Sequence, residues 1–281
     1  MLHLEIVDGE YRTAPRKVSW FARLFPSFAF YSRLAVIILR ASSKAKRGRY
    51  DSAEWASSSV EVIRALERVG VELEVTGLQY LTLIDSPCLI VGNHMSTLET
   101  TVLPGLIQPI REVTFVVKQS LLDYPVFKHV MRSRDPIAVS QKDVRGDFKA
   151  MMEGGLERLA QGRSLVVFPE GKRMPTLDPA RFNTIGVKLA QRAGVPIVPF
   201  ALDTGAWGIG KWISDMGRID PTRKVRFAFG EPMTVEGRGA AEHQAIVQFI
   251  SNKLAAWREE CLPVVESLET EALPKTSTQP T

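Results

Sequence analysis

Cysteine is scarce in this chain, and its scarcity bears on both compartment and metal chemistry. The 281 residues include two cysteines, Cys88 and Cys261, which lie far apart. This spacing fits neither a disulfide framework nor the paired cysteines of a zinc site, so it favours a reducing compartment. Cys88 stands between Pro87 and Leu89, a setting typical of a core residue.

Long apolar runs and several active-site signatures are also missing. No uninterrupted apolar run approaches the roughly 20 residues that a membrane-spanning helix needs. The start of the sequence has no basic lead-in, and no small-residue cleavage site follows the first apolar stretch, so we expect no secretory signal. The chain has neither a Gly-x-Ser-x-Gly nucleophile elbow nor a Gly-x-x-x-x-Gly-Lys phosphate loop.

Acidic residues are absent from residues 11–50, which contain ten of the Lys and Arg residues. Residues 20–39 are apolar and aromatic but are interrupted by Arg23, Pro26 and Arg33. We therefore predict an amphipathic helical element that lies in the plane of an anionic membrane surface. The protein would be monotopic or peripheral, at the cytoplasmic face of the inner membrane. The cations directed at lipid headgroups would be Arg40, Lys44, Lys46, Arg47 and Arg49. The alternative is a basic arm or a helix packed on the core.

The rest of the chain alternates between helix and strand patterns. Apolar residues recur at helical spacing over 52–69, and an alternating pattern follows at 71–75. Further strands are predicted at 87–92, 113–118, 164–168, 197–202 and 224–229. Further helices are predicted at 147–160, 184–193 and 240–260. This order is typical of an α/β fold with a mixed, largely parallel sheet flanked by helices.

Composition divides the chain into three parts. Residues 1–50 form the basic, amphipathic membrane-docking segment, and residues 51–262 carry the α/β pattern. Residues 263–281 are acidic at first and then rich in Pro, Ser and Thr, which predicts a disordered tail.

A first polar cluster follows the predicted strand 87–92, at the kind of strand end where α/β sheets place their sites. Its sequence is Asn93-His94-Met95-Ser96-Thr97-Leu98-Glu99. In one regular helix, His94 and Glu99 would point about 140° apart, so they meet only if His94 lies on the turn before the helix. Glu99 would then fix the His94 tautomer that leaves one ring nitrogen free as a base. Alternatively, Ser96 and Glu99 form a capping box that has no catalytic role.

A second polar cluster follows the predicted strand 164–168. Its sequence is Phe168-Pro169-Glu170-Gly171-Lys172-Arg173. Gly171 suits a turn where backbone comes close to a ligand. Arg173 is suited to a bidentate grip on a phosphate, and Lys172 adds a point charge. The alternative is a solvated turn in which Glu170 pairs with a neighbouring cation.

The order of these clusters carries a family resemblance. Asn93-His94-x-Ser96 is followed some 75 residues later by the Phe168–Arg173 block, and about 25 residues further by Val195-Pro196-Ile197-Val198-Pro199-Phe200. In this order and spacing the chain resembles the glycerolipid acyltransferase family, and within it the bacterial 1-acylglycerol-3-phosphate acyltransferases. The resemblance covers roughly residues 55–233 and implies that residues 51–262 form an acyltransferase domain.

The resemblance implies transfer of a fatty acyl group from acyl-coenzyme A (acyl-CoA) or acyl carrier protein to the free hydroxyl of lysophosphatidic acid in phospholipid biosynthesis. His94 would be the general base and Glu99 its orienting acid. The substrate site would include Asn93 and Ser96, which would shape the turn, together with Glu170, Gly171, Lys172 and Arg173, with Lys118 as a further candidate. No cofactor or metal is implied. The expected partners are the thioester donor, the lysophospholipid acceptor and the membrane surface, and nucleic acid is not among them.

Two positions differ from the family pattern and keep alternatives open. Most relatives have Asp where this chain has Glu99, and they commonly have Arg where it has Gln141-Lys142. The second difference favours another acceptor as the alternative: another lysophospholipid, a lyso-ornithine lipid or a lipid A precursor. An alternative from another class is a non-catalytic membrane-binding protein of the same fold, in which Glu99 is only a helix cap.

Overall fold

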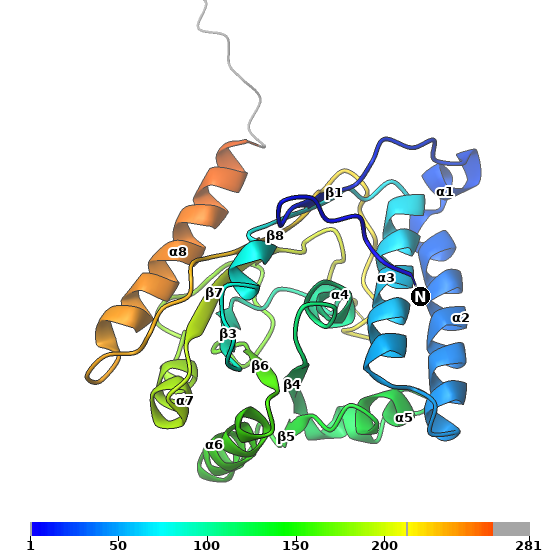
Figure 1. Cartoon of the computed structure of the whole chain (residues 1–281). Helices are drawn as coiled ribbons and strands as arrows, with labels where there is room; N and C mark the ends of the chain where they lie inside the picture. The colour runs from blue at the N-terminus through cyan, green and yellow to red at the C-terminus, as the bar shows by residue number, and fades with distance from the viewer. Residues whose placement is uncertain (1, 212, 261–281) are drawn as a thin grey trace, which may run out of the picture.

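The strands of this protein form one mixed sheet in the computed structural model, which describes residues 2–211 and 213–260 (Figure 1). They are β1 (Tyr11–Arg12), β2 (Leu73–Thr76), β3 (Leu89–Gly92), β4 (Val113–Lys118), β5 (Ile137–Val139), β6 (Ser164–Val167), β7 (Ile197–Asp203) and β8 (Val225–Phe229). The strand order is β1-β2-β8-β7-β3-β6-β4-β5. Only β1–β2 and β7–β8 pair antiparallel among the described strands, so the predicted largely parallel sheet is confirmed.

Helices cover both faces of the sheet, as predicted. They are α1 (Trp20–Leu24), α2 (Pro26–Lys46), α3 (Ser52–Arg68), α4 (Leu98–Ile107), α5 (Phe127–Arg132), α6 (Val144–Ala160), α7 (Ile185–Ala193) and α8 (Ala240–Glu259). Two 3-10 turns, η1 (Leu78–Leu81) and η2 (Gln119–Leu122), complete the set for the described chain. One core lies between the sheet and α3 with α4, and the other between the sheet and α6, α7 and α8.

Strand β3 contributes to both cores because its side chains alternate between the two faces. Ile90 packs into the core beneath α3 and α4, whereas Leu89 and Val91 pack into the core beneath α6, α7 and α8. A strand buried on both faces is apolar throughout, which explains the continuous apolar run in the sequence. Cys88, which comes just before β3, is fully buried, as predicted for a core residue.

The predicted membrane-docking segment also takes part in the fold. Tyr11 is buried and belongs to β1, which pairs with β2 at the sheet edge. Helix α2 packs on α3, and its Phe30, Leu34 and Ile37 are buried in the same core, so the alternative of a helix packed on the core is correct for this face. Among the described residues, no helix is both long enough and apolar enough to cross a membrane. The predicted disordered tail, residues 263–281, lies outside the described residues.

The carboxyl end of β3 is held tightly against β7. A Cβ atom added to Gly92 would lie 2.4 Å from the carbonyl oxygen of Phe200, so β3 can approach β7 this closely only with glycine here. The next residue, Asn93, donates through Nδ2 to the Leu202 carbonyl oxygen at 2.9 Å and accepts from the Leu202 amide at 3.0 Å. These contacts fix the point at which the chain leaves the sheet.

Candidate active site

His94 lies on the turn between β3 and α4, as its five-residue separation from Glu99 requires. Its ring Nδ1 lies 2.8 Å from Oε1 of Glu99. The His94 side chain is 18% exposed, whereas Glu99 is completely buried. The imidazole stacks on the ring of Phe168, with the two centroids 4.4 Å apart. The ring is thus held on one side by a carboxylate and on one face by an aromatic side chain, while part of it reaches solvent.

Glu99 accepts hydrogen bonds at both of its oxygens. Besides His94, Oε1 accepts the backbone amides of Met95 at 2.6 Å and Ser96 at 2.8 Å. Oε2 accepts the hydroxyls of Ser96 at 3.0 Å and Thr204 at 2.7 Å. The capping interaction and the contact with His94 therefore exist together, and neither interpretation of the sequence excludes the other.

The ionisation of Glu99 determines which nitrogen of His94 carries the proton. Complete burial raises the pKa of Glu99, but the hydrogen bonds from His94, the Ser96 amide and Thr204 outweigh burial, so its pKa is lowered overall. An ionised carboxylate only accepts hydrogen bonds, so the Nδ1 atom of His94 must donate. Its Nε2 atom is then free to take a proton from a substrate.

Two residues predicted for the substrate site have side chains that face inward. Asn93 is 1% exposed and bonds the backbone of Leu202, and Ser96 is 2% exposed and bonds Glu99 and Thr204. The Ser96 hydroxyl also accepts the amide of Leu98 at 3.0 Å, where α4 begins. Because these atoms are occupied inside the protein, we assign both side chains the shaping of the His94 turn.

Glu170 supports the same turn from the second cluster. Its Oε2 accepts the backbone amide of His94 at 2.8 Å, so it does not form the exposed ion pair of the alternative interpretation. Burial raises the pKa of Glu170. Gly171 has a φ of +66°, the left-handed conformation that the turn requires, and no protein atom lies within 4 Å of an added Cβ. Its amide donates to the Phe168 carbonyl oxygen at 3.0 Å.

The three predicted cations lie in different settings. Arg173 is 22% exposed in its side chain and pairs with Asp215 at 2.7 Å, and the amide of the following Met174 donates to the His94 carbonyl oxygen at 2.7 Å. Lys172 is exposed on the same turn. Lys118 is exposed at the carboxyl end of β4, which is separated from β3 by β6. The structure therefore brings Arg173 close to the His94 turn, whereas Lys118 lies further along the same sheet edge.

Sequence reasoning missed four residues that build this site: Thr97, Phe168, Thr204 and Asp215. Thr204 directly follows β7, so the rule that sites lie at carboxyl ends of strands was the signal for it. Phe168 was within the quoted motif, but its stacking on His94 has no sequence pattern. Asp215 lies in the connection between β7 and β8, where nothing in the sequence marks it.

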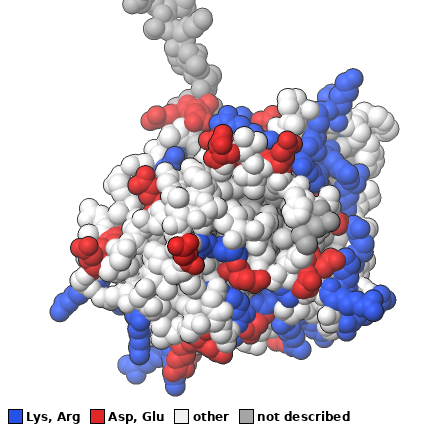
Figure 2. Space-filling model, viewed as in Figure 1, with Lys and Arg blue, Asp and Glu red and all other residues white. Residues whose placement is uncertain are grey.

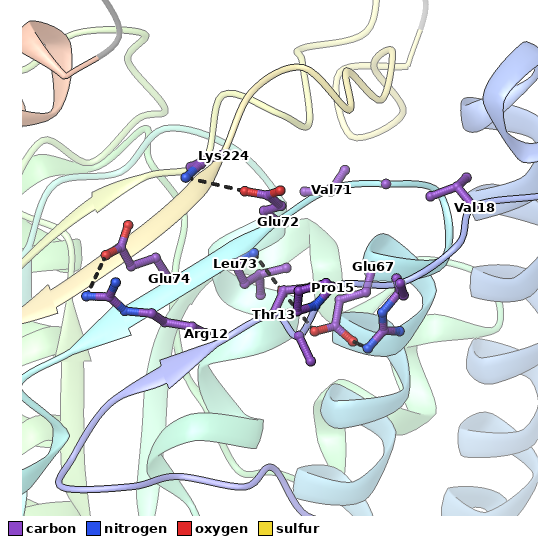
Figure 3. Close-up of a pocket in the computed structure, with 13 residues that line it drawn as sticks. Arg12, Thr13, Pro15, Val18, Glu67, Val71, Glu72, Leu73, Glu74 and Lys224 are labelled. Atoms are coloured by element: carbon purple, nitrogen blue, oxygen red, sulfur yellow. Dashed lines mark hydrogen bonds and ion pairs between the residues drawn. The ribbon is translucent and has the colours of Figure 1, made fainter.

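A cavity of about 360 Å³ lies elsewhere, between β2 and the segment that follows β1 (Figure 3). Its charged side chains pair with one another: Arg12 lies 3.2 Å from Glu74, and Lys224 lies 3.3 Å from Glu72. None of the predicted site residues lines it in the described structure. Nor does the described part of the chain contain three or more His, Cys, Asp or Glu residues grouped to hold a metal ion.

Known proteins are similar to this one in sequence and in fold. Residues 72–203 match the family model described as Acyltransferase. The chain is also 28% identical over 257 residues to the 1-acyl-sn-glycerol-3-phosphate acyltransferase of Pseudomonas aeruginosa, a match covering 91% of this chain and 93% of that protein. Residues 72–203 form a domain of the acyltransferase family. The resemblance seen in the sequence is therefore confirmed, and this acyltransferase is an enzyme of the O-acyltransferase class.

Other relatives support the same family. The probable 1-acyl-sn-glycerol-3-phosphate acyltransferase of Mycoplasma genitalium is 28% identical over 166 residues, which covers 56% of this acyltransferase and 58% of that protein. The crystal structure of the 1-acyl-sn-glycerophosphate acyltransferase from Thermotoga maritima matches with a TM-score of 0.63 at 18% identity, covering 85% of this chain and 97% of that one. At this identity the structural match establishes the fold alone.

Proposed function

We propose that this acyltransferase transfers a fatty acyl group from a thioester to the free hydroxyl of lysophosphatidic acid, with no cofactor. The observation that carries this proposal is the contact of the buried Glu99, whose pKa is lowered, with Nδ1 of His94 at 2.8 Å, on a turn that Arg173 contacts through Thr97. The arrangement also counts against a non-catalytic protein of the same fold, because a cap alone would not require the contact with His94. The names of the bacterial relatives support lysophosphatidic acid as the acceptor.

The proposed reaction is a direct transfer. The acceptor hydroxyl gives its proton to Nε2 of His94 while its oxygen attacks the thioester carbonyl carbon. The carbon–sulfur bond of the resulting tetrahedral intermediate breaks, and the imidazolium gives the proton to the leaving thiolate, which departs as the thiol. Glu99 stabilises the imidazolium through its contact with Nδ1. Since no activated nucleophile is needed, sequential kinetics are expected.

The direct test measures thiol release from acyl-CoA and from acyl carrier protein thioesters, in detergent, with a panel of lysolipid acceptors. Release that depends on lysophosphatidic acid supports the proposal, and the faster thioester identifies the donor. If none of the acceptors in the panel gives thiol release, the proposal is contradicted.

Gln141 favours a second acceptor class, because its amide donates to the Gly171 carbonyl oxygen at 2.8 Å and places an uncharged group beside the turn. The panel therefore includes zwitterionic lysophospholipids and a lyso-ornithine lipid.

Arg173 is expected to bind the acceptor phosphate. Removing a charged hydrogen-bond donor costs about 1.5–3 kcal/mol, so Arg173→Ala should lower kcat/KM for lysophosphatidic acid by about 10- to 100-fold, mainly through KM. Arg173→Lys should retain part of the activity, because it keeps the charge but loses the fork geometry. Arg132→Ala is the matched control, since Arg132 pairs with Asp123 at 2.8 Å. An equal loss in both alanine variants would exclude a specific role for Arg173.

We further propose that α1 and the start of α2 dock this acyltransferase on an anionic membrane. Trp20, Leu24, Phe25 and Phe28 are between 54% and 73% exposed. Figure 2 shows Lys and Arg side chains gathered over the side formed by α1 and α2. Arg40 and Lys44 are themselves paired with Glu61 and Glu54 of α3, so the remaining cations are the ones expected to face headgroups. Exposed apolar groups beside cations are typical of interfacial helices.

The docking helices are joined to the active site through the β7–β8 connection. The Tyr31 hydroxyl donates to the Gly217 carbonyl oxygen at 2.5 Å, and the Ile219 amide donates to the Ser27 hydroxyl at 3.0 Å. The same connection carries Asp215, the partner of Arg173. A membrane beneath α1 would therefore lie on the side from which a lipid acceptor reaches this part of the site.

The double variant Trp20→Ser/Phe28→Ser is expected to bind vesicles containing phosphatidylglycerol about 100-fold more weakly or worse, because each exposed aromatic contributes roughly 1.5–3 kcal/mol on burial. Co-sedimentation with vesicles measures the change. Leu83→Ser is the control, since Leu83 is 70% exposed at another part of the surface. Unchanged sedimentation of the double variant would contradict docking through these helices.

A further inference from the structure

Arg173 already has an anionic partner within the protein. One guanidinium nitrogen, Nη1, lies 2.7 Å from Oδ1 of Asp215. The side chains are 22% and 37% exposed, so the ion pair is partly screened from solvent. Asp215 lies in the β7–β8 connection, and Arg173 lies after β6, so two separate segments meet here.

Two hydroxyl groups complete the contacts of the guanidinium. The Thr97 hydroxyl accepts from Nη1 of Arg173 at 2.5 Å and donates to Oδ1 of Asp215 at 3.1 Å. The Ser214 hydroxyl accepts from Nη2 of Arg173 at 3.1 Å. We call Thr97, Arg173, Ser214 and Asp215 the Arg173 latch. Oxygen atoms of the protein thus accept from Nη1 and Nη2, two of the guanidinium nitrogens that could donate to a phosphate.

The Arg173 latch lies directly beside the proposed base. Thr97 is three residues after His94, immediately before α4. On the other side, Met174 bonds the His94 carbonyl oxygen through its amide at 2.7 Å. A phosphate held by Arg173 would therefore be anchored to the same turn as His94, so the contacts of Arg173 bear on how the acceptor binds.

We propose that Asp215 is a built-in competitor for Arg173, which the phosphate of the acceptor displaces when it binds. This inference rests on the proposed function, in which Arg173 binds that phosphate. The apparent affinity for the acceptor is then the intrinsic affinity multiplied by the fraction of molecules in which Arg173 is not paired with Asp215. Acceptors that lack a phosphate do not use Arg173 and gain nothing from removal of the competitor.

The geometry favours displacement over a fixed role for Asp215. A carboxylate that stayed 2.7 Å from Arg173 would face the bound phosphate with a like charge, which is unfavourable at such short range. The backbone is anchored independently, because Nε1 of the buried Trp207 donates to the Asp215 carbonyl oxygen at 3.1 Å. The partly exposed carboxylate can therefore turn towards solvent while the main chain stays in place.

The test removes the charge of Asp215 and measures both transfer and phosphate binding. Asp215→Asn is expected to lower KM for lysophosphatidic acid about three- to tenfold with little change in kcat, since a partly exposed ion pair is lost as a competitor. Thermal protection by inorganic phosphate should reach its half-maximum at a concentration lowered by a similar factor. Asp215→Ser gives an independent second measurement of the same loss of charge.

Two controls separate competition from a general charge effect. The double variant Arg173→Ala/Asp215→Asn should have the same kcat/KM as Arg173→Ala, because the competitor acts only through Arg173. Asp123→Asn removes the same charge from a more exposed pair, in which Asp123 lies 2.8 Å from Arg132, and should leave KM for the acceptor unchanged.

Each contrary result has a distinct meaning. A higher KM in Asp215→Asn would show that Asp215 orients Arg173, which overturns the inference. If Asp215→Asn raises kcat/KM equally with and without Arg173, the inference is also overturned. The same holds if the half-maximal phosphate concentration is equal in the unmodified enzyme and in Asp215→Asn. Absence of acceptor-dependent thiol release from the unmodified enzyme would instead contradict the proposed function. The phosphate titration would then still test the competition, because it does not require acyl transfer.

Discussion

The variant His94→Ala is expected to reduce acyl transfer by about two to four orders of magnitude, the range that a positioned general base contributes. The alanine leaves Arg173 and the acceptor contacts in place, so the loss should appear mainly in kcat. No neighbouring group replaces Nε2, because Glu99 is completely buried behind the ring. Acceptor-dependent thiol release, measured with saturating thioester, gives the change in rate.

His129→Ala is the matched control for loss of a histidine, because His129 lies on α5 and outside the proposed site. It should retain full activity. Circular dichroism and Tm establish that both variants are folded, and a Tm shift of a few degrees is acceptable for His94→Ala, since the ring packs on Phe168. A folded His94→Ala enzyme with more than a tenth of the original kcat would show that His94 is not the base.

The sequence was sufficient to locate the His94–Glu99 pair because both residues lie in one short segment after a buried strand. The five-residue separation limited the geometry to a turn followed by a helix, and the structure has that geometry. It did not decide between a cap and a catalytic partner. The contacts expected of each are present together, because Oε1 of Glu99 is shared among His94, Met95 and Ser96.

Contacts between distant segments were beyond sequence reasoning. Thr204 is 105 residues from Glu99 and Asp215 is 118 residues from Thr97, so the pairs depend on the strand order β7-β3-β6. No local pattern specifies that order. The contact of the Asn93 side chain with Leu202 was beyond sequence reasoning for the same reason, since it appears only when β3 and β7 lie side by side.

Local chemistry explains where the predicted elements differ at their ends. Helix α6 begins at Val144, ahead of the predicted residue 147, because the Asp143 side chain accepts the amides of Arg145 and Gly146 and caps the helix. Helix α7 ends as predicted, with Gly194 in the left-handed conformation at a φ of +65°. Strand β1 was missed because its two residues are too short to show alternation.

Glu99→Gln is expected to lower kcat by about two to three orders of magnitude, because a neutral amide neither stabilises the imidazolium nor fixes the Nδ1–H tautomer of His94. Glu99→Asp should recover part of the rate, since the charge remains while the reach is one methylene shorter. Thr204→Val tests the hydrogen bond that supports Glu99: it removes the bond to Oε2 and leaves the contact between Glu99 and His94 intact. This variant should lose stability, and its loss of kcat should be much smaller than that of Glu99→Gln.

The variant Glu99→Gln should also alter the pH dependence of the free energy of unfolding. The pKa of Glu99 is lowered in the folded protein from an ordinary value of 4.5. The ionised carboxylate therefore stabilises the fold above pH 4.5, and this contribution is lost as pH falls through the lowered pKa. In urea unfolding, the difference in unfolding free energy between the unmodified enzyme and Glu99→Gln should be largest near neutral pH and should shrink below pH 4.5. A difference that stays constant across this range would mean that Glu99 is not held ionised, and the tautomer assigned to His94 would then lose its physical basis.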